Sequence, residues 1–560
     1  MLAADFIAER LVALGIRHVF GVGGANIEDL FVAVQRRRPA IAAVLCKHEH
    51  GAGTAADGYA RITGRLGVVL VTSGGGAMNL VHALAEARAS HVPLLALVGE
   101  PPTELQGRGA FQDTSGRGGL VDARAVYAAV TKFAARVEDV GALPELLAEA
   151  IASATTAPAG PAVLLLAKDR QRATLRDVAA ELPPTPELET PSREVVEAAA
   201  STLGPGPVVV IAGDEVARHG ARAELAAFVE KLAATVAVTP DGRDAFDNRS
   251  PVFLGVAGSM GHPEVLAALS EDAELVVVGT RLPLLARQGL EGRLRERVAV
   301  SLGDEPPFAP FHGRVHLGGD LRRTLPALAR SLAARSPRGL AWSLRAEPDA
   351  ALLADRDAFL DSQRVLAAVD RALPERSVVL VDAGNSGAAA AHLVRVPAGG
   401  RWLLALGMAG MGYTFGAAVG AALASGRRCT VLAGDGAFFM HGFEVHTALE
   451  HRLPITYVVL NNRAHGMCLV RERLLLKTRA DYNEFGPCAL GAGLGMMLDG
   501  LTACDCSTLG ELEAALERAN AATGPVLIGA TLAAVDVPPF AAFQEAGGAA
   551  FERLGEGRAP

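Results

Sequence analysis

The chain contains little cysteine, with six residues of this type in 560. Thiols so widely spread do not form the disulfide framework of a small secreted domain. Cys504 and Cys506 lie close together, but no second cysteine pair or histidine follows at the spacing of a zinc site. We therefore interpret them as ordinary thiols and expect a protein of the reducing cytoplasm.

Long apolar runs and an excess of basic residues are also missing. No uninterrupted apolar stretch reaches the roughly 18 residues of a membrane-spanning helix, so we expect no membrane partner. The formal net charge of −8 gives no reason to expect nucleic acid, whose partners usually carry a basic face. Residues 1–16 include acidic side chains in a helical pattern, which predicts a first domain helix rather than a signal peptide.

Apolar residues, in contrast, are abundant at 50%, and only 20% of residues are charged. Such a chain can build large cores, and at about 100–200 residues per domain it should form three domains. Short apolar runs alternate with helical patterns, which predicts parallel sheets covered by helices. In the first third, helices are expected at 3–14 and 77–89 and strands at 17–22, 41–45, 67–72 and 93–98.

The predicted fold class is α/β, with three doubly wound parallel-sheet domains. We expect them over residues 1–175, 190–335 and 355–545. A segment rich in proline and polar residues, 182–193, is typical of a linker between the first two. In the central domain, strands are expected at 208–212 and 275–279. In the last, they are expected at 378–381, 401–406, 429–433, 456–460 and 525–529.

The sharpest motif is Gly434-Asp435-Gly436, followed after 24 residues by Asn461-Asn462. The first element closes a predicted strand and the second closes the next, with a helix expected over 442–450. The carboxyl ends of neighbouring parallel strands lie together and are where such sheets bind ligands. Glycine lets the backbone approach a diphosphate, while Asp435 and Asn462 offer oxygens to Mg²⁺. The alternative is a tight turn followed by an ordinary loop.

This arrangement resembles the thiamine-diphosphate-dependent enzymes, and among them the acetohydroxyacid (acetolactate) synthases. The resemblance implies pyrimidine-binding, central and diphosphate-binding domains, in that order. It also implies that Asp435, Asn462 and the carbonyl of Ala464 bind Mg²⁺. Further cofactor contacts implied in the last domain involve Ala409, Met411, Gly434, Gly436, Ala437, Gly466 and Met467.

Glu49 is the candidate for activating the cofactor. It stands after the strand expected at 41–45, and the segment around it resembles the family motif RHEQGAG. A poorly solvated carboxyl here would share its proton with the aminopyrimidine ring. Without the second motif, a helix-capping acid would be the simpler interpretation. In the family, this glutamate and the Mg²⁺ site come from different subunits, so a dimer is the minimum unit and a tetramer is expected.

Other first-domain segments follow the same group. Residues 73–80 resemble its SGPGATNL motif and residues 20–24 the start of FGYPGG, which implies that Gly23, Ser73 and Asn79 contact the cofactor. Glycines here could equally serve tight turns only. Phe111-Gln112 resembles part of the synthase motif DAFQET, and Gln112 could hold a carbonyl or hydroxyl without supplying an acid. A plain loop glutamine is the alternative.

The reaction implied is decarboxylation of a 2-keto acid, with pyruvate the expected donor, followed by addition of its acyl group to a carbonyl acceptor. Pyruvate decarboxylases carry a glutamate where this chain has Cys468, which favours ligation. Arg281, in a segment resembling the synthase motif GxRFDDR, would pair with a carboxylate of the acceptor. A surface ion pair is the alternative.

The resemblance fails at several positions. After Arg281 the motif is lost, and residues 259–262 replace the synthases' MHGT; both segments contact FAD in those enzymes, so FAD is in doubt here. Arg471 replaces a tryptophan that shapes the substrate site and could meet an anionic acceptor. His465, beside the expected metal carbonyl, could face the substrate or lie in an exposed loop.

Three alternative functions make different demands on the sequence. A 2-keto-acid decarboxylase would release an aldehyde, and a non-catalytic paralogue would lack the catalytic residues that are present here. A nicotinamide dehydrogenase would need a glycine-rich G-x-G-x-x-G turn after a strand, with an acidic residue about 20 positions on, which is not found. The sequence therefore predicts a carboligase of acetolactate-synthase type.

Overall fold

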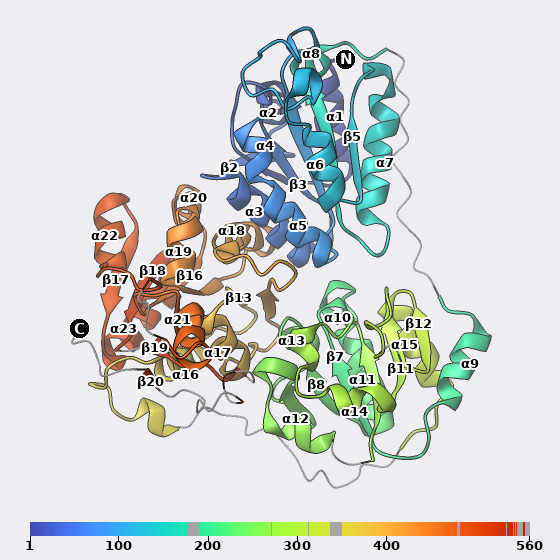
Figure 1. Cartoon of the computed structure of the whole chain (residues 1–560), viewed down its shortest axis with the longest axis vertical. Helices are drawn as coiled ribbons and strands as arrows, with labels where there is room; N and C mark the ends of the chain where they lie inside the picture. Colours follow the sequence, from blue (N-terminus) through green and yellow to red (C-terminus); the bar gives the residue numbers. More distant parts are fainter. Residues whose placement is uncertain are drawn as a thin grey trace.

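The computed structural model describes residues 1–176, 190–269, 272–311, 313–335, 350–478, 482–533, 535–540, 543, 545 and 553–554. They form three six-stranded sheets with helices on their faces (Figure 1). All strand pairs within these sheets are parallel; one two-stranded antiparallel ladder, β19 (Val535–Asp536) with β20 (Arg553–Leu554), lies apart. The predicted class, three doubly wound parallel sheets, is confirmed. No helix of the described part is both long and apolar enough to span a membrane.

The first domain carries the sheet order β2-β1-β3-β4-β6-β5. Its strands are β1 (His18–Gly21), β2 (Ala42–Leu45), β3 (Gly67–Val71), β4 (Leu94–Glu100), β5 (Phe133–Arg136) and β6 (Pro161–Ala167). Its helices are α1 (Ala3–Ala13), α2 (Glu28–Gln35), α3 (Glu49–Thr63), α4 (Gly75–Asn79), α5 (Val81–Ala89), α6 (Ala123–Val130), α7 (Leu143–Thr155) and α8 (Lys168–Arg172). Strands β3, β4 and β6 are buried along their whole length, as expected for a sheet covered on both faces.

The central domain has the order β12-β11-β10-β7-β8-β9. Its strands are β7 (Val208–Ala212), β8 (Thr235–Val238), β9 (Phe253–Val256), β10 (Glu274–Val278), β11 (Val298–Gly303) and β12 (Val315–Gly318). Its helices are α9 (Arg193–Ser201), α10 (Glu215–Arg218), α11 (Arg222–Leu232), α12 (Pro263–Ala268), α13 (Leu284–Arg287), α14 (Glu291–Arg297) and α15 (Leu321–Arg330).

The third domain repeats the topology of the first, with the order β14-β13-β15-β16-β18-β17. Its strands are β13 (Val378–Val381), β14 (Arg401–Leu404), β15 (Cys429–Gly434), β16 (Ile455–Asn461), β17 (Thr502–Cys506) and β18 (Val526–Thr531). Its helices are α16 (Ser362–Ala372), α17 (Asn385–Leu393), α18 (Tyr413–Ser425), α19 (Asp435–His441), α20 (Glu444–Glu450), α21 (Gly466–Leu474), α22 (Leu490–Met497) and α23 (Leu509–Ala521).

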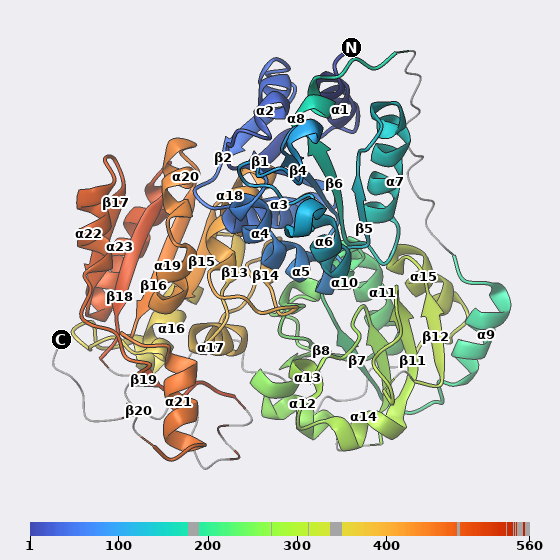
Figure 2. The same cartoon turned by 45° about the horizontal axis from the view of Figure 1, so that its top comes forward.

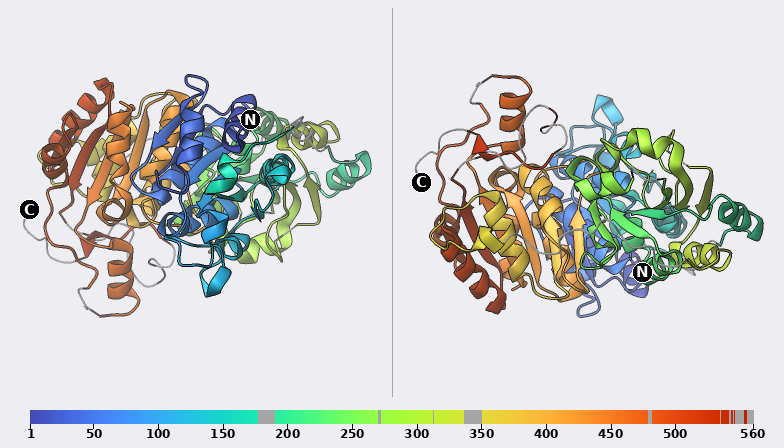
Figure 3. Two further views of the ribbon diagram at one scale, coloured as in Figure 1. Left: turned by 90° about the horizontal axis from the view of Figure 1, so that it is seen from above. Right: turned by 90° about the horizontal axis from the view of Figure 1, so that it is seen from below.

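The first and third domains pack through equivalent helices, α3 and α18, which both follow the second strand of their sheet (Figure 2). Glycines make this contact possible. A Cβ on Gly420 would lie 1.8 Å from the carbonyl oxygen of Ala55, and one on Gly58 would lie 2.2 Å from that of Ala417. One apolar core consequently spans both domains. The central domain lies beneath the first domain and beside the third in Figure 1, and the first domain partly covers it in the view from above (Figure 3).

Two helix predictions need correction. The helix expected over 77–89 is two helices, because α4 ends at Asn79 and α5 begins at Val81. The helix expected over 442–450 begins at Glu444 and is preceded by α19, which starts directly at Asp435. Most of the linker expected at 182–193 lies outside the described residues.

Candidate active site

The motif residues of the third domain meet at the carboxyl edge of its sheet. Strands β15 and β16 are neighbours, with Gly434 opposite Leu460, so Asp435 and Asn462 follow adjacent strand ends. Both line a cavity of about 60 Å³. Its walls include nearly all residues expected around the diphosphate and the metal: Met411, Gly434, Asp435, Gly436, Ala437, Asn462, Ala464, Gly466 and Met467.

Asp435 has the character of a metal ligand. Its side chain is buried, and Oδ1 accepts the backbone N–H of Gly436 at 2.9 Å. Oδ2 has no hydrogen-bond partner among the described residues, and neither has Oδ1 of Asn385, which lines the same cavity. Burial raises the pKa of Asp435 to about 6. Buried oxygens without partners are costly unless a cation or a proton satisfies them, so this cavity fits Mg²⁺ and its diphosphate.

A second, larger cavity of about 400 Å³ adjoins the first. The two share Ala383, Gly384 and Met467 as lining residues. The walls of the larger one are almost entirely apolar, and Met260 and Leu285 of the central domain contribute to them. Ala409, expected near the cofactor's amino group, and Arg471, expected near the substrate, both line this cavity. Residues expected beside the cofactor and beside the substrate therefore line one cavity.

The segment after β13, residues 382–386, was missed in the sequence although it lines both cavities. Asp382 is buried there and accepts the backbone N–H of Gly412 at 2.9 Å and the hydroxyl of Thr414 at 2.7 Å. These bonds fix the loop that carries Met411. The signal in the sequence was Asp382-Ala383-Gly384 directly after an apolar run. In the structure, Gly384 adopts a φ of 96°, which favours glycine.

The first domain assembles a separate polar group around Glu49. This residue begins α3, and its Oε2 accepts the side-chain N–H of Asn79 at 2.9 Å. A Cβ on Gly76 would lie 3.0 Å from Oε1 of Glu49, so the glycine turn packs directly against the carboxylate. Ser73 at the start of this turn accepts a hydrogen bond from Asn26 at 2.8 Å. Gly23, also expected near the cofactor, follows β1 and has open space where a Cβ would lie.

Gln112 joins this first-domain group. A Cβ on Gly74 would lie 2.7 Å from the Cβ of Gln112, which itself adopts a φ of 59°. Neighbouring Asp113 anchors the loop, because its carboxylate accepts the backbone N–H groups of Gly107 at 2.7 Å and Ser115 at 2.9 Å. This loop is an ordered part of the first domain.

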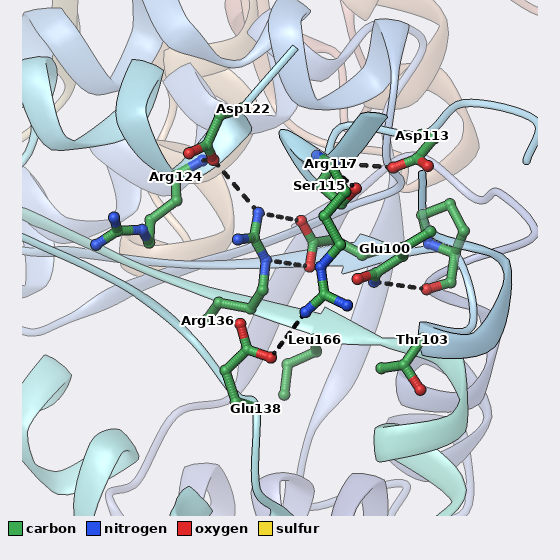
Figure 4. A network of polar contacts seen from close by, with 12 residues as sticks. Glu100, Thr103, Asp113, Ser115, Arg117, Asp122, Arg124, Arg136, Glu138 and Leu166 are labelled. Carbon is green, nitrogen blue, oxygen red and sulfur yellow. Dashed lines mark hydrogen bonds and ion pairs between the residues drawn. The ribbon is translucent and has the colours of Figure 1, made fainter. Parts of the chain in front are cut away.

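A network of ion pairs around buried Glu100, at the far end of the same loop, adds to its rigidity (Figure 4). Fully buried Glu100 accepts two hydrogen bonds from Arg136, at 2.8 and 2.9 Å. Arg136 also reaches Asp122 at 3.4 Å, and Arg117 pairs with Glu138 at 3.3 Å. Bidentate pairs of this kind fix geometry as well as charge.

A single chain keeps the two polar groups apart. No residue of the first domain is among those that line either cavity in the described part of the chain. Glu49 is oriented by Asn79, and Phe111 beside Gln112 is 82% exposed. Phe439 and Phe443 in α19 and just before α20 are about half exposed. The first-domain group and the third-domain cavities are therefore two separate regions of the chain, called half-sites below, with exposed aromatic side chains near each.

The remaining candidates differ in position. His465 lines the smaller cavity, where its Nδ1 has no partner among the described residues and a Cβ on Gly436 would meet it at 2.7 Å. Arg281, in contrast, lines neither cavity. Its guanidinium pairs with Glu305 at 3.1 Å and lies over the ring of Phe308, 4.1 Å from the centroid. Its side chain is thus engaged within the central domain.

Comparison with protein families identifies the domains that carry these residues. Three regions match the domains of one family: "Thiamine pyrophosphate enzyme, N-terminal TPP binding domain" over residues 1–117, its central domain over 206–328 and its C-terminal TPP binding domain over 382–530. The chain belongs to the thiamine pyrophosphate enzymes. The expectation of a thiamine-diphosphate-dependent enzyme is confirmed, and the half-sites lie in its two cofactor-binding domains.

Individual relatives extend the comparison over most of the enzyme. The chain is 28% identical to acetolactate synthase isozyme 2 large subunit of Escherichia coli, over 97% of the chain and 99% of that protein. It is 29% identical to the acetolactate synthase large subunit of Corynebacterium glutamicum, over 83% and 76%. Benzoylformate decarboxylase from Polynucleobacter necessarius shares the fold, with a TM-score of 0.80 at 21% identity, over 95% of the chain and 99% of that structure.

Proposed function

We propose that this enzyme is a Mg²⁺-dependent carboligase of acetolactate-synthase type, which takes a 2-keto acid, pyruvate in the first instance, and a carbonyl acceptor. The observation that carries the proposal is the meeting of Asp435, Asn462 and Ala464 at one sheet edge, beside an apolar cavity. Similarity to acetolactate synthases over nearly the whole chain favours this reaction within the family. When bound, thiamine diphosphate supplies the electron sink for loss of CO₂ and transfer of the acyl group.

The third domain would hold the cofactor's charged end. Asp435, the side-chain oxygen of Asn462 and the carbonyl of Ala464 would bind Mg²⁺, which prefers oxygen ligands and usually keeps diphosphate oxygens among them. Gly434, Gly436 and Gly466 leave room for the diphosphate. Met411 and Ala409, on the loop fixed by Asp382, would contact the cofactor. His465 stays a candidate for contact with the substrate.

The first domain would supply proton transfer. Glu49 would share a proton with the aminopyrimidine ring, oriented by Asn79 and packed against the glycine turn. Gln112 would hold a substrate oxygen from the same side. Because these groups and the cavities are separate in one chain, we propose that two chains complete each site, with a dimer as the minimum and a tetramer as the expected assembly.

The larger cavity favours ligation over protonation. Among the described residues that line it, the only ionisable side chains are Asp382, whose oxygens already accept hydrogen bonds, and Arg471, which stays protonated. The cavity thus adds no acid to the proposed Glu49, which favours addition to a second carbonyl compound over release of an aldehyde.

We propose that the central domain binds no FAD. Gly213 and Gly279 follow β7 and β10, the neighbouring strands between which the strand order reverses, and a Cβ on Gly213 would lie 2.5 Å from the carbonyl oxygen of Gly279. The four-residue helix α10 begins with buried Glu215, and the backbone N–H of Asp304 is engaged by that carboxylate at 2.7 Å. Acids where a dinucleotide phosphate would bind repel it. We assign no flavin to this chain.

Product analysis tests the proposal. The purified chain with thiamine diphosphate, Mg²⁺ and pyruvate should release CO₂ and form acetolactate or acetoin, measured by mass spectrometry. A panel of larger 2-keto acids, alone and in pairs, should identify the preferred donor and acceptor. Aldehyde as the main product from every donor would instead make the enzyme a decarboxylase. Absence of CO₂ release from all donors would reject the proposal.

A further inference from the structure

The mostly apolar lining of the larger cavity includes one cationic side chain. Met260, Leu404 and Phe543 are typical of its lining. Among the described lining residues, Arg471 on α21 is the only cation. The cavity measures about 400 Å³, and because Ala409, expected near the cofactor, is among its lining residues, the cofactor and a substrate would share this space.

Among the described residues, no side chain or carbonyl forms a hydrogen bond or ion pair with the guanidinium of Arg471. The other charged lining residue is Asp382, whose oxygens accept bonds from Gly412 and Thr414. By contrast, Arg473 on the same helix pairs with Glu484 at 3.1 Å. Arg471 is exposed and available to an anion.

We propose that Arg471 and the larger cavity recognise a carboxylate that the substrate keeps through the reaction, carried on an apolar body larger than that of pyruvate. This inference rests on the proposed function for its chemistry but not for the binding site itself. The planar guanidinium suits a carboxylate bidentately, and the apolar walls suit a branched or aromatic body.

The carboxylate that leaves as CO₂ is not the one expected at Arg471. An ion pair with that group would stabilise the ground state and be lost on the way to the transition state, which opposes catalysis. A retained carboxylate has two sources: the 2-keto acid acceptor, or the distal end of a dicarboxylic donor. Either source would place a negative charge in the larger cavity, which Ala409 and Met467 also line.

A binding experiment tests the inference without catalysis. The full chain with thiamine diphosphate and Mg²⁺ is titrated with 4-methylpentanoate and with its uncharged amide, followed by saturation-transfer NMR. Wild type should bind the acid roughly tenfold more tightly than the amide. Arg471→Gln should abolish this preference and Arg471→Lys should keep part of it. Lys477→Gln, which removes a nearby exposed cation outside the cavity lining, should leave it unchanged.

Equal binding of acid and amide by wild type overturns the inference, as does a preference that survives in Arg471→Gln. The wild-type comparison decides the question even if the variant fails to fold. Kinetics then separate the two sources: Arg471→Gln should raise KM about tenfold for 2-ketobutyrate but not for propanal as acceptor if the acceptor carries the charge. If instead Arg471→Gln raises KM for 2-oxoglutarate as donor but not for 2-oxopentanoate, the group at Arg471 is the distal carboxylate of the donor. If no donor loses CO₂, the proposed function fails while the binding result still stands.

Discussion

Glu86 of the first domain holds the backbone of Ala409 in the third, because its Oε2 accepts the N–H of Ala409 at 3.2 Å. The same carboxylate also accepts the N–H of Gly407 at 3.1 Å and that of Met408. Glu86 lies on α5, which follows α4, where Asn79 contacts Glu49. One short helical segment therefore touches both half-sites of the chain.

Replacing Glu86 with glutamine should loosen this loop. The variant keeps the size of the side chain but loses the charge that three backbone donors share, at a cost of about 2 kcal/mol or more for a buried charged acceptor. We expect a lower Tm and a weaker affinity for thiamine diphosphate, measured by thermal melting and calorimetry. Glu149→Gln, in an acid of α7 outside this contact, serves as the control.

The two readouts separate positioning from stability. If Glu86→Gln lowers Tm while the affinity for thiamine diphosphate stays at the wild-type value, the loop does not need Glu86 to present Ala409 and Met411.

The sequence could predict that Asp435 and Asn462 meet at one sheet edge, but not this contact between domains. Asp435 and Asn462 stand directly at strand ends, so the parallel-sheet rule brings them together without knowledge of packing. Glu86 and Gly407 are 321 positions apart, and no periodicity links them. The helix break at Leu80 was missed for a related reason, since neither proline nor glycine marks it. Contacts between helices of different domains cannot be predicted from the periodicity of a single sequence.

Glu49→Gln should remove activity while leaving cofactor binding intact. The amide cannot share a proton with the pyrimidine ring, and general acid–base groups typically contribute about 10²–10⁴-fold. Turnover of pyruvate should fall within this range, with an unchanged affinity for thiamine diphosphate by calorimetry. Asn79→Leu, which removes only the 2.9 Å bond that orients the carboxylate, should have a smaller effect. Near-wild-type turnover of Glu49→Gln would exclude Glu49 from proton transfer.

Mg²⁺-dependent cofactor binding should weaken in mild acid. Burial raises the pKa of Asp435 to about 6, so below that pH a proton occupies the carboxylate that the metal needs. Apparent Mg²⁺ affinity should therefore be level above the pKa and fall by up to about tenfold per pH unit below it. Calorimetric titrations across this range measure the effect. Asp435→Asn should bind weakly at every pH, and an affinity equal to wild type would remove Asp435 from the ligand set.

The purified enzyme should carry no flavin. Buried Glu215 begins α10 directly after β7, at the edge where a dinucleotide phosphate would bind, so its carboxylate would repel that phosphate. We expect no flavin band in the visible spectrum and no quenching of free FAD fluorescence on titration with the chain. A stoichiometric flavin band would show that FAD binds despite Glu215.

Arg281→Ala should leave the acceptor KM unchanged, in contrast to Arg471→Gln. In the structure, Arg281 pairs with Glu305, which also contacts His91 at 3.1 Å, and lines neither cavity. Both partners of the pair are about one-third exposed, so its loss should cost no more than about 1 kcal/mol of stability. Acceptor kinetics and thermal melting measure the two effects. A KM that rises for keto-acid acceptors would instead require the Glu305 pair to open and Arg281 to turn towards the substrate, as its sequence context predicts.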